Sequence, residues 1–325
     1  MIRLLIPLLT AGLVLLGSAR AGDPVAPVRI GVLAFGTVNW EIAAMENEGL
    51  AKASGIRVIP TNLASAEAAK IALQGKAVDV IVADWIWVAR QREQGADFAF
   101  APYSTSHGAL MVPGDSAIHS VGDLKGKKLG IAGGGLDKNW LLLQGLAKKK
   151  YGFDLDKSVE KVFGAPPLLN QQFLQGKLDA LLNYWHYAAK LEAQGYRSVL
   201  DGRALLRELG IDAELANLGY VFRESWASDN SAALKTFIEV SGKARGSLCE
   251  SDAAWQKVVP LTQESDPKTS SLLRQRYCEG QIKTWGEREV KAAGQVFDLL
   301  HEVGGEALTG KSEHLPAGVF WTFRK

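Results

Sequence analysis

The residues best suited to chemistry in this 325-residue sequence are aromatic side chains that follow short apolar runs. Five of the nine tryptophans lie at such positions, namely Trp40, Trp85, Trp87, Trp140 and Trp185. Indole faces stack on flat heteroaromatic rings and attract quaternary ammonium groups. We expect Trp85 and Trp185, which end equivalent runs, to face one ligand. Trp87 and Trp140 stand one step further into predicted helices and could equally pack a helix onto a sheet.

Polar side chains accompany these tryptophans. Asp84 and Asn183 close two of the apolar runs, where they can orient a hydrogen-bond donor. Lys138, with the backbone N–H groups of residues 134–139 at the start of a predicted helix, can hold an anionic tail. We therefore predict eight ligand-binding residues: Asn39, Trp40, Asp84, Trp85, Lys138, Asn139, Asn183 and Trp185. The stretch from Ser104 to His107 could reach the rim of the same site, with His107 as an ordinary loop histidine.

Signatures of catalysis are missing from the sequence. It contains no G-x-S-x-G elbow, no H-E-x-x-H pair and neither of the glycine-rich nucleotide motifs. The five histidines show no metal or triad spacing; they are His107, His119, His186, His301 and His314. We therefore predict a binding protein rather than an enzyme, with no catalytic residue, no metal ligand and no cofactor.

The elements that position the predicted site repeat along the chain at an offset of 100 residues. Residues 28–32 form a β-branched run that leads through a glycine loop to Asn39-Trp40, and residues 128–132 lead in the same way to Asn139-Trp140. A second pair of apolar runs, at residues 80–82 and 180–182, follows two matching Gln-Gly-Lys sequences. Short apolar strands without polar alternation, each followed by a helix, are typical of parallel sheets covered on both faces. The sequence therefore predicts two similar α/β lobes.

The order of these elements predicts how the lobes are connected. Strands at residues 109–112 and 218–222 should leave and re-enter the first lobe, so that two segments cross between lobes and form a hinge. We assign residues 22–112 and 218–325 to lobe 1, with a helical C-terminal part, and residues 113–217 to lobe 2. Ligands of open parallel sheets bind beyond the carboxyl ends of the strands. The predicted residues should therefore line one cleft between the lobes.

The N-terminal residues predict export. Arg3 is followed by an apolar run at residues 4–17 and by an A-x-A cleavage sequence at residues 19–21, which together read as a signal peptide spanning residues 1–21. The mature chain should begin near Gly22 and be soluble in the periplasm. Removing Arg3 and Arg20 lowers Lys+Arg from 37 to 35 against 35 Asp+Glu, a formal net charge of zero. A neutral chain argues against a nucleic-acid partner, which requires a basic face.

Two cysteines, Cys249 and Cys278, lie 29 residues apart in a chain that we expect to enter an oxidising compartment. One disulfide between them is the natural interpretation. Two buried free thiols are the alternative that the sequence leaves open.

The region where the chain enters the second lobe resembles a known family. Leu110 to Ile118, then Ser120, then the DLKGKKLG sequence from Asp123 to Gly130 are similar to the corresponding passage of the NMT1/THI5-like periplasmic binding proteins for alkanesulfonates, taurine, nitrate and thiamine-pyrimidine precursors. The resemblance spans about residues 28–230. It implies a periplasmic-binding-protein type II fold, two α/β lobes joined by a two-strand hinge, that closes on a small molecule.

The same resemblance implies the partners and leaves alternatives. A monomeric protein of this kind delivers its ligand to an ABC permease and its ATPase in the inner membrane. A sensor that presents its bound state to a membrane receptor is a second hypothesis, and an enzyme on the same scaffold is a third. Uptake that depends on the protein, or turnover of a bound compound, distinguishes them.

Overall fold

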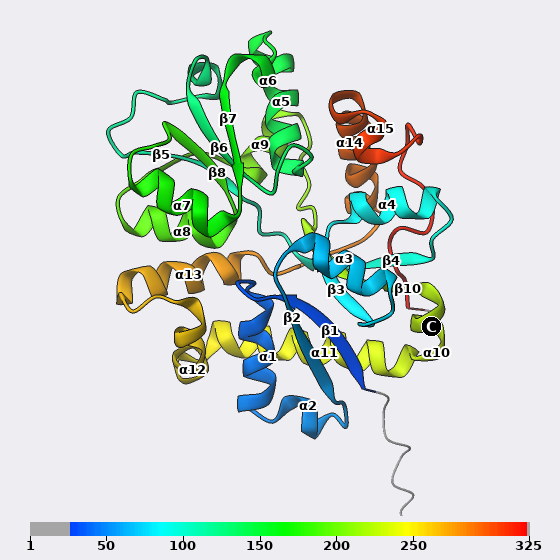
Figure 1. The fold of residues 1–325 in the computed structure, drawn as a ribbon. Coiled ribbons are helices and arrows are strands. Elements are labelled where there is room, and N and C mark those ends of the chain that lie inside the picture. Colours follow the sequence, from blue (N-terminus) through cyan, green and yellow to red (C-terminus); the bar gives the residue numbers. More distant parts are fainter. Residues whose placement is uncertain (1–26, 324–325) are drawn as a thin grey trace, which may run out of the picture.

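The computed structural model describes residues 27–323 of the chain. The predicted signal peptide and the predicted mature start near Gly22 lie outside the described residues. Figure 1 shows two lobes, one above the other, each built around its own sheet with helices on both faces. The prediction of two α/β lobes is therefore confirmed.

The first sheet has the strand order β2-β1-β3-β10-β4. Its strands are β1 (Val28–Leu33), β2 (Val58–Leu63), β3 (Val80–Ala83), β4 (Phe98–Ser104) and β10 (Leu218–Arg223). β1 pairs in parallel with β2 and β3, whereas β10 runs antiparallel to both β3 and β4. Residues of β1 and β3 are largely buried, as expected for short apolar strands between two helical layers.

The second sheet repeats this order with β7-β6-β8-β5-β9. Its strands are β5 (Ala109–Val112), β6 (Lys128–Ala132), β7 (Glu160–Gly164), β8 (Ala180–Asn183) and β9 (Arg197–Asp201). β6 pairs in parallel with β7 and β8, and β5 runs antiparallel to β8 and β9. β1 thus corresponds to β6 and β3 to β8, at the 100-residue offset that the sequence shows.

The chain crosses between the lobes at residues 105–108 and again at residues 209–217. The predicted position of the first crossing, near residue 112, is wrong because β5 pairs only with strands of the second sheet. The two crossing segments are bonded to one another. The backbone N–H of Asn217 donates to the carbonyl of Ser104 at 2.7 Å, and its side-chain amide donates to the carbonyl of Ser106 at 2.8 Å. Both segments therefore form one hinge.

Helices cover both sheets. Those of the first repeat are α1 (Val38–Asn47), α2 (Leu50–Ala53), α3 (Ala66–Gln74) and α4 (Trp85–Glu93). Those of the second are the 3₁₀ turn Val121–Leu124, α5 (Lys138–Tyr151), α6 (Leu155–Ser158), α7 (Pro166–Leu174), α8 (Trp185–Ala193) and α9 (Gly202–Glu208). Within residues 27–323 no helix is both long and apolar enough to span a membrane.

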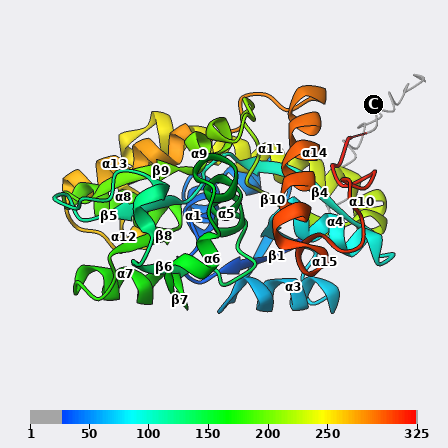
Figure 2. The ribbon, with the colours of Figure 1, turned by 90° about the horizontal axis from the view of Figure 1, so that it is seen from above.

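The C-terminal part is helical, as predicted. It comprises α10 (Glu224–Asp229), α11 (Ser231–Glu250), α12 (Asp252–Thr262), α13 (Pro267–Glu279), α14 (Glu287–Gly304) and α15 (Glu306–Thr309). α11 and α12 pack on α1 of the first lobe, whereas α13 also packs on α8, and α14 packs on α5, both of the second lobe. Figure 2, seen from above, shows these helices distributed across the width of the molecule, with α12 and α13 on one side and α10, α14 and α15 on the other. α13 ends at Glu279, and Gln281 just beyond it forms an isolated bridge to Ser104 of β4.

A disulfide joins Cys249 at the end of α11 to Cys278 at the end of α13. The predicted pairing is therefore present, and the alternative of two free thiols is wrong. The bond ties two helices whose side chains, as described next, line the space between the lobes.

Candidate ligand-binding site

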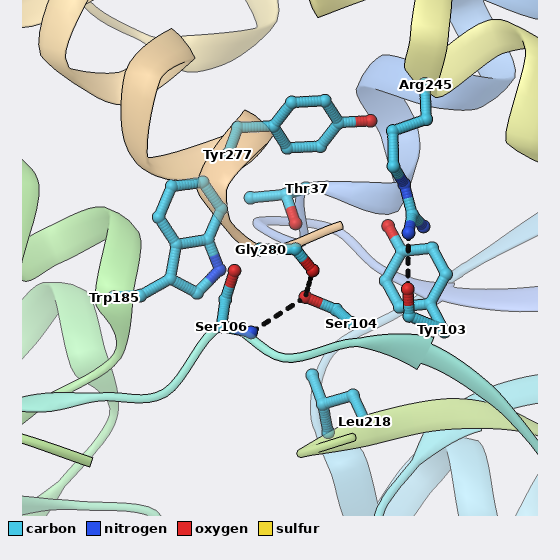
Figure 3. Close-up of a pocket in the computed structure, with 9 residues that line it drawn as sticks. All are labelled: Thr37, Tyr103, Ser104, Ser106, Trp185, Leu218, Arg245, Tyr277 and Gly280. Carbon is cyan, nitrogen blue, oxygen red and sulfur yellow. Dashed lines mark hydrogen bonds between the residues drawn. The ribbon is translucent and has the colours of Figure 1, made fainter. Parts of the chain in front are cut away.

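A small chamber lies at the hinge, where the two lobes meet. Its wall is formed by nine residues from both lobes and from the first crossing: Thr37, Tyr103, Ser104, Ser106, Trp185, Leu218, Arg245, Tyr277 and Gly280. Figure 3 shows the Trp185 indole beside Ser106 on one side and Arg245 beside Tyr103 on the other. The chamber measures about 20 Å³, enough for one water molecule. A larger solute therefore requires the lobes to separate.

Hydroxyl groups form the floor of the chamber. The backbone N–H of Ser106 donates to the Ser104 hydroxyl at 3.1 Å, and that hydroxyl donates to the carbonyl of Gly280 at 3.3 Å. The backbone N–H of Thr105 also donates to the Gly280 carbonyl, at 2.9 Å. These bonds fix the crossing segment against the end of α13. The floor is therefore rigid and polar.

Trp185 forms the wall contributed by the second lobe. Its indole stands edge-on to Trp40 with ring centroids 6.0 Å apart, and lies 6.3 Å from the ring of Tyr277. Trp40 in turn stands edge-on to Trp255, at 5.6 Å. Aromatic pairs favour such edge and offset arrangements. A side chain of lobe 2 therefore contacts an aromatic cluster of lobe 1 across the chamber.

A buried ion pair supports the opposite wall. The Arg245 Nε donates to the Glu41 carboxylate at 3.0 Å, and the guanidinium lies 3.9 Å from the centre of the Tyr103 ring. The hydroxyls of Tyr103 and Tyr277 each donate to the same carboxylate at 2.6 Å. Burial, together with the Glu41 charge, raises the pKa of both tyrosines well above the usual value. Both therefore stay neutral donors at physiological pH.

A second, larger chamber of about 240 Å³ lies on the other side of Trp185 and shares Ser106 with the first. Its charged lining residues come from both lobes. They are Glu192, Asp201 and Arg203 of lobe 2, and Arg276 and Glu279 of α13. Arg276 bonds to Glu192 at 3.0 Å across the lobes and to Glu279 at 2.9 Å within α13. Trp185 is thus the partition between a small space with one charged wall residue, Arg245, and a larger space lined by five charged residues.

Four helices begin at the carboxyl ends of strands that face the cleft, and they differ in capping. Asp84 caps α4 by accepting from the N–H of Trp87 at 2.9 Å, and Asp137 caps α5. The N-cap residues of α1 and α8 are Thr37 and Tyr184, whose side chains make no capping hydrogen bond. The first N–H groups of a helix require an external acceptor. The two uncapped helices, one from each lobe, are those that carry chamber residues.

The predicted tryptophans divide between the core and the site. Trp185 lines both chambers. Trp85, expected as its partner in the cleft, is instead a core residue with 1% of its surface exposed. Its indole N–H donates to the carbonyl of Ala216 at 3.1 Å, and its ring packs against Phe320 at 6.0 Å. Trp40 is 4% exposed and lies behind Trp185 as its support.

The predicted polar residues hold the surrounding loops and the hinge. The Asn39 side chain donates to two carbonyls of its own loop, and the Asn183 amide donates to the carbonyl of Pro166 at 3.2 Å. Lys138 Nζ donates to the carbonyl of Asn217 at 2.9 Å. Burial lowers the Lys138 pKa, whereas the charges of Asp84 and Asp137 oppose this shift. Asn139 is buried beside them, and its side-chain oxygen has no partner among the described residues.

Several chamber residues were not predicted from the sequence. Arg245 and Tyr277 lie on amphipathic helices, where a polar side chain is indistinguishable from one that faces solvent. Tyr103 belongs to β4, a strand that the sequence analysis did not identify. Ser104 and Ser106 were expected at the rim of the cleft and form its floor. Within residues 27–323 no three His, Cys, Asp or Glu side chains gather as a metal site.

Comparison with known proteins gives a family match. The sequence model described as NMT1/THI5 like matches residues 46–251 of this chain, which is more than half of its length. A search of curated protein sequences gives no match.

Solved structures show the same fold. The alkanesulfonate-binding protein SsuA from Xanthomonas axonopodis pv. citri, solved bound to MOPS, is 17% identical, has a TM-score of 0.71, and is matched over 92% of this chain and 99% of its own. The periplasmic aliphatic sulphonate binding protein SsuA from Escherichia coli is 19% identical with a TM-score of 0.71, over 90% and 96% of the two chains. The desulfurization enzyme DszB is also similar, at 13% identity and a TM-score of 0.55, over 90% and 97%. The chain has the periplasmic-binding-protein type II fold.

Proposed function

The chain belongs to the NMT1/THI5-like family, and on this premise we propose that it is the substrate-binding component of an ABC importer. It captures a small organic solute between its lobes and delivers the solute to a permease in the inner membrane. Its structural similarity to an alkanesulfonate-binding protein and to a periplasmic aliphatic sulphonate binding protein supports this role.

One observation carries the proposal: a single chamber receives side chains from both lobes and from the hinge that joins them. Trp185 comes from lobe 2, Tyr277 from lobe 1 and Ser106 from the crossing segment. A solute that contacts all three holds the two lobes together, with the walls of the chamber spaced to fit the solute. Its binding free energy therefore stabilises the closed state, which is how a ligand shifts a two-state equilibrium.

The chamber also indicates the general chemistry of the solute. Trp185 and Tyr277 offer aromatic faces, which suit a flat or apolar part of the ligand. The hydroxyl group of Thr37, with the uncapped starts of α1 and α8, offers donors to an oxygen-bearing group. We propose an organic solute that combines both features and that leaves the protein chemically unchanged.

Localisation and partners follow from the same proposal. Residues 1–21 direct export, and the mature chain acts in the periplasm as a monomer. The permease contacts the outer surfaces of both lobes and recognises their closed arrangement. No nucleic acid and no cofactor takes part.

The test is to express the chain with its own N-terminus, purify it from the periplasm and record native mass spectra. We expect a mature mass that begins near Gly22 and a bound small molecule that is released on unfolding. Cells that express the cognate permease should take up this compound only when the binding protein is present. Conversion of the released compound by the purified protein would instead favour an enzyme, and uptake without the protein would contradict the proposal.

A further inference from the structure

Glu41 is a fully buried carboxylate on α1, with 0% of its surface exposed. It lies behind the chamber and does not line it. Five side chains from four other elements donate hydrogen bonds to it: Tyr103 of β4, Tyr220 of β10, Ser241 and Arg245 of α11, and Tyr277 of α13. One carboxylate is thus the common acceptor for side chains of four other elements.

Three of these donors form the wall of the chamber. Tyr103, Arg245 and Tyr277 all line it, so Glu41 fixes the positions of three wall residues that come from three different elements. Without the carboxylate, the two phenol hydroxyls and the guanidinium lose their common acceptor. The geometry of this wall therefore depends on one residue behind it.

The charge of the wall depends on the same residue. Arg245 is the only charged side chain among the nine that line the small chamber. Its Nε lies 3.0 Å from Glu41, one terminal nitrogen donates to the carbonyl of Tyr103, and its side chain is only 11% exposed. A cation paired at this distance presents little net charge to a group on its other side.

We infer that Glu41 sets the charge selectivity of the chamber by neutralising Arg245. The inference rests on the proposed function, since it concerns the solute that the cleft binds. In the native protein Arg245 donates hydrogen bonds and provides a flat surface. It does not raise the affinity for an anionic group above the affinity for a neutral one. Removing the Glu41 charge converts the same wall into a cationic site.

The experiment compares two probes that share a ring and a sulfonyl group and differ in charge at pH 7: benzenesulfonate and benzenesulfonamide. Isothermal titration calorimetry on the mature protein gives both dissociation constants and their ratio. In Glu41→Gln we expect the preference for benzenesulfonate over benzenesulfonamide to rise about tenfold or more relative to the native chain. In Arg245→Met, where the Glu41 charge is unopposed, the preference should shift in the opposite direction.

Two further variants separate the effect of the Glu41 charge from the effect of Glu41 on the geometry of the chamber wall. Ser241 donates to Glu41 at 2.8 Å, also bonds to the Tyr220 hydroxyl and lies outside the chamber. Ser241→Ala therefore removes both bonds without changing the charge and should leave the ratio unchanged. The double variant Glu41→Gln with Arg245→Met should return the ratio to the native value. It contains no unpaired buried charge, and it therefore folds even where a single variant does not.

An equal loss of affinity for both probes in Glu41→Gln shows that the residue is merely structural and overturns the inference. Binding of neither probe by the native chain or by any variant overturns it as well. The proposed function is tested apart from this inference by native mass spectrometry. A bound solute in those spectra still supports the function, and the lack of a bound solute counts against it.

Discussion

Trp85 and Trp185 occupy the same position in the two lobes, yet they have different roles. Each is the first residue of the helix that follows the third strand of its repeat, α4 and α8. Trp85 is buried with its N–H bonded to Ala216, whereas Trp185 separates two chambers. Position within the repeat therefore does not decide whether a tryptophan is buried in the core or borders a chamber.

The difference comes from a distant segment. Residues 319–321 run beside β4, where the N–H of Phe100 donates to the carbonyl of Val319 and the N–H of Trp321 donates to the carbonyl of Phe100, each at 2.8 Å. Phe320 thereby packs on Trp85 in lobe 1. The aromatic neighbours of Trp185 are instead Trp40 and Tyr277 of the opposite lobe. One tryptophan belongs to the core of its own lobe, and the other belongs to a contact between the two lobes.

The largest effect that we predict concerns the buried member of the pair. Trp85→Ala should lower the free energy of unfolding by about 3–5 kcal/mol, because it leaves a cavity under Phe320 and an unpaired carbonyl at Ala216. Urea denaturation followed by circular dichroism measures this loss. Trp85→Phe, which keeps a smaller aromatic ring and loses the N–H, should cost clearly less. A loss below about 1 kcal/mol in Trp85→Ala would place the residue outside the core.

The disulfide provides the next test, because it occurs in the lobe that supplies Arg245 and Tyr277. Replacing Cys249 and Cys278 with serine opens a 29-residue loop, which chain-entropy estimates value at about 3–4 kcal/mol. The midpoint of thermal unfolding should fall accordingly. Reductant should destabilise the native chain and leave the double variant unaffected. Two thiols that react with an alkylating agent in unreduced, unfolded protein would show that the bond does not form.

Trp185→Ala should show the opposite pattern to Trp85→Ala. Stacking on an aromatic side chain contributes about 1–3 kcal/mol in nucleic-acid complexes, so we expect solute affinity to fall by tenfold or more. The free energy of unfolding should change by less than half of the Trp85→Ala effect, because Trp185 borders two chambers and leaves no sealed cavity. Calorimetry and urea denaturation on both variants make the comparison. Equal stability losses with unchanged affinity would assign Trp185 to the core as well.

Much of the fold can be predicted from the sequence, because its signals are local and repeated. The 100-residue repeat predicts both β-α pairs in each lobe, and the helical character of the C-terminal part is predicted as well. The first crossing could not be placed correctly, because β5 is an apolar strand that suits either sheet. Which sheet it joins depends on pairing with β8 and β9, and no residue of β5 itself encodes that choice.

The site is less predictable for a related reason. Of the eight predicted ligand-binding residues, Trp185 alone lines a chamber. Residues at strand ends are also where helices need caps and loops need internal bonds, and Asn39, Asp84 and Asn183 serve those needs. The side chains that replace them in the wall, Arg245 and Tyr277, come from a C-terminal part of the chain with no repeat to indicate their position.

The smallest predicted effect concerns Asp84, the N-cap residue of α4. Its carboxylate caps α4, whereas Tyr184 at the equivalent position of α8 makes no cap. Asp84→Ala should cost about 1 kcal/mol of unfolding free energy, and Asp84→Asn should cost little because asparagine also caps well. Neither change should alter solute affinity in calorimetry, since Asp84 lines neither chamber. A tenfold loss of affinity in both variants, at unchanged stability in Asp84→Asn, would return this carboxylate to the ligand site. Lys138 of lobe 2 would then be the first partner to examine, because the charge of Asp84 acts to raise the Lys138 pKa.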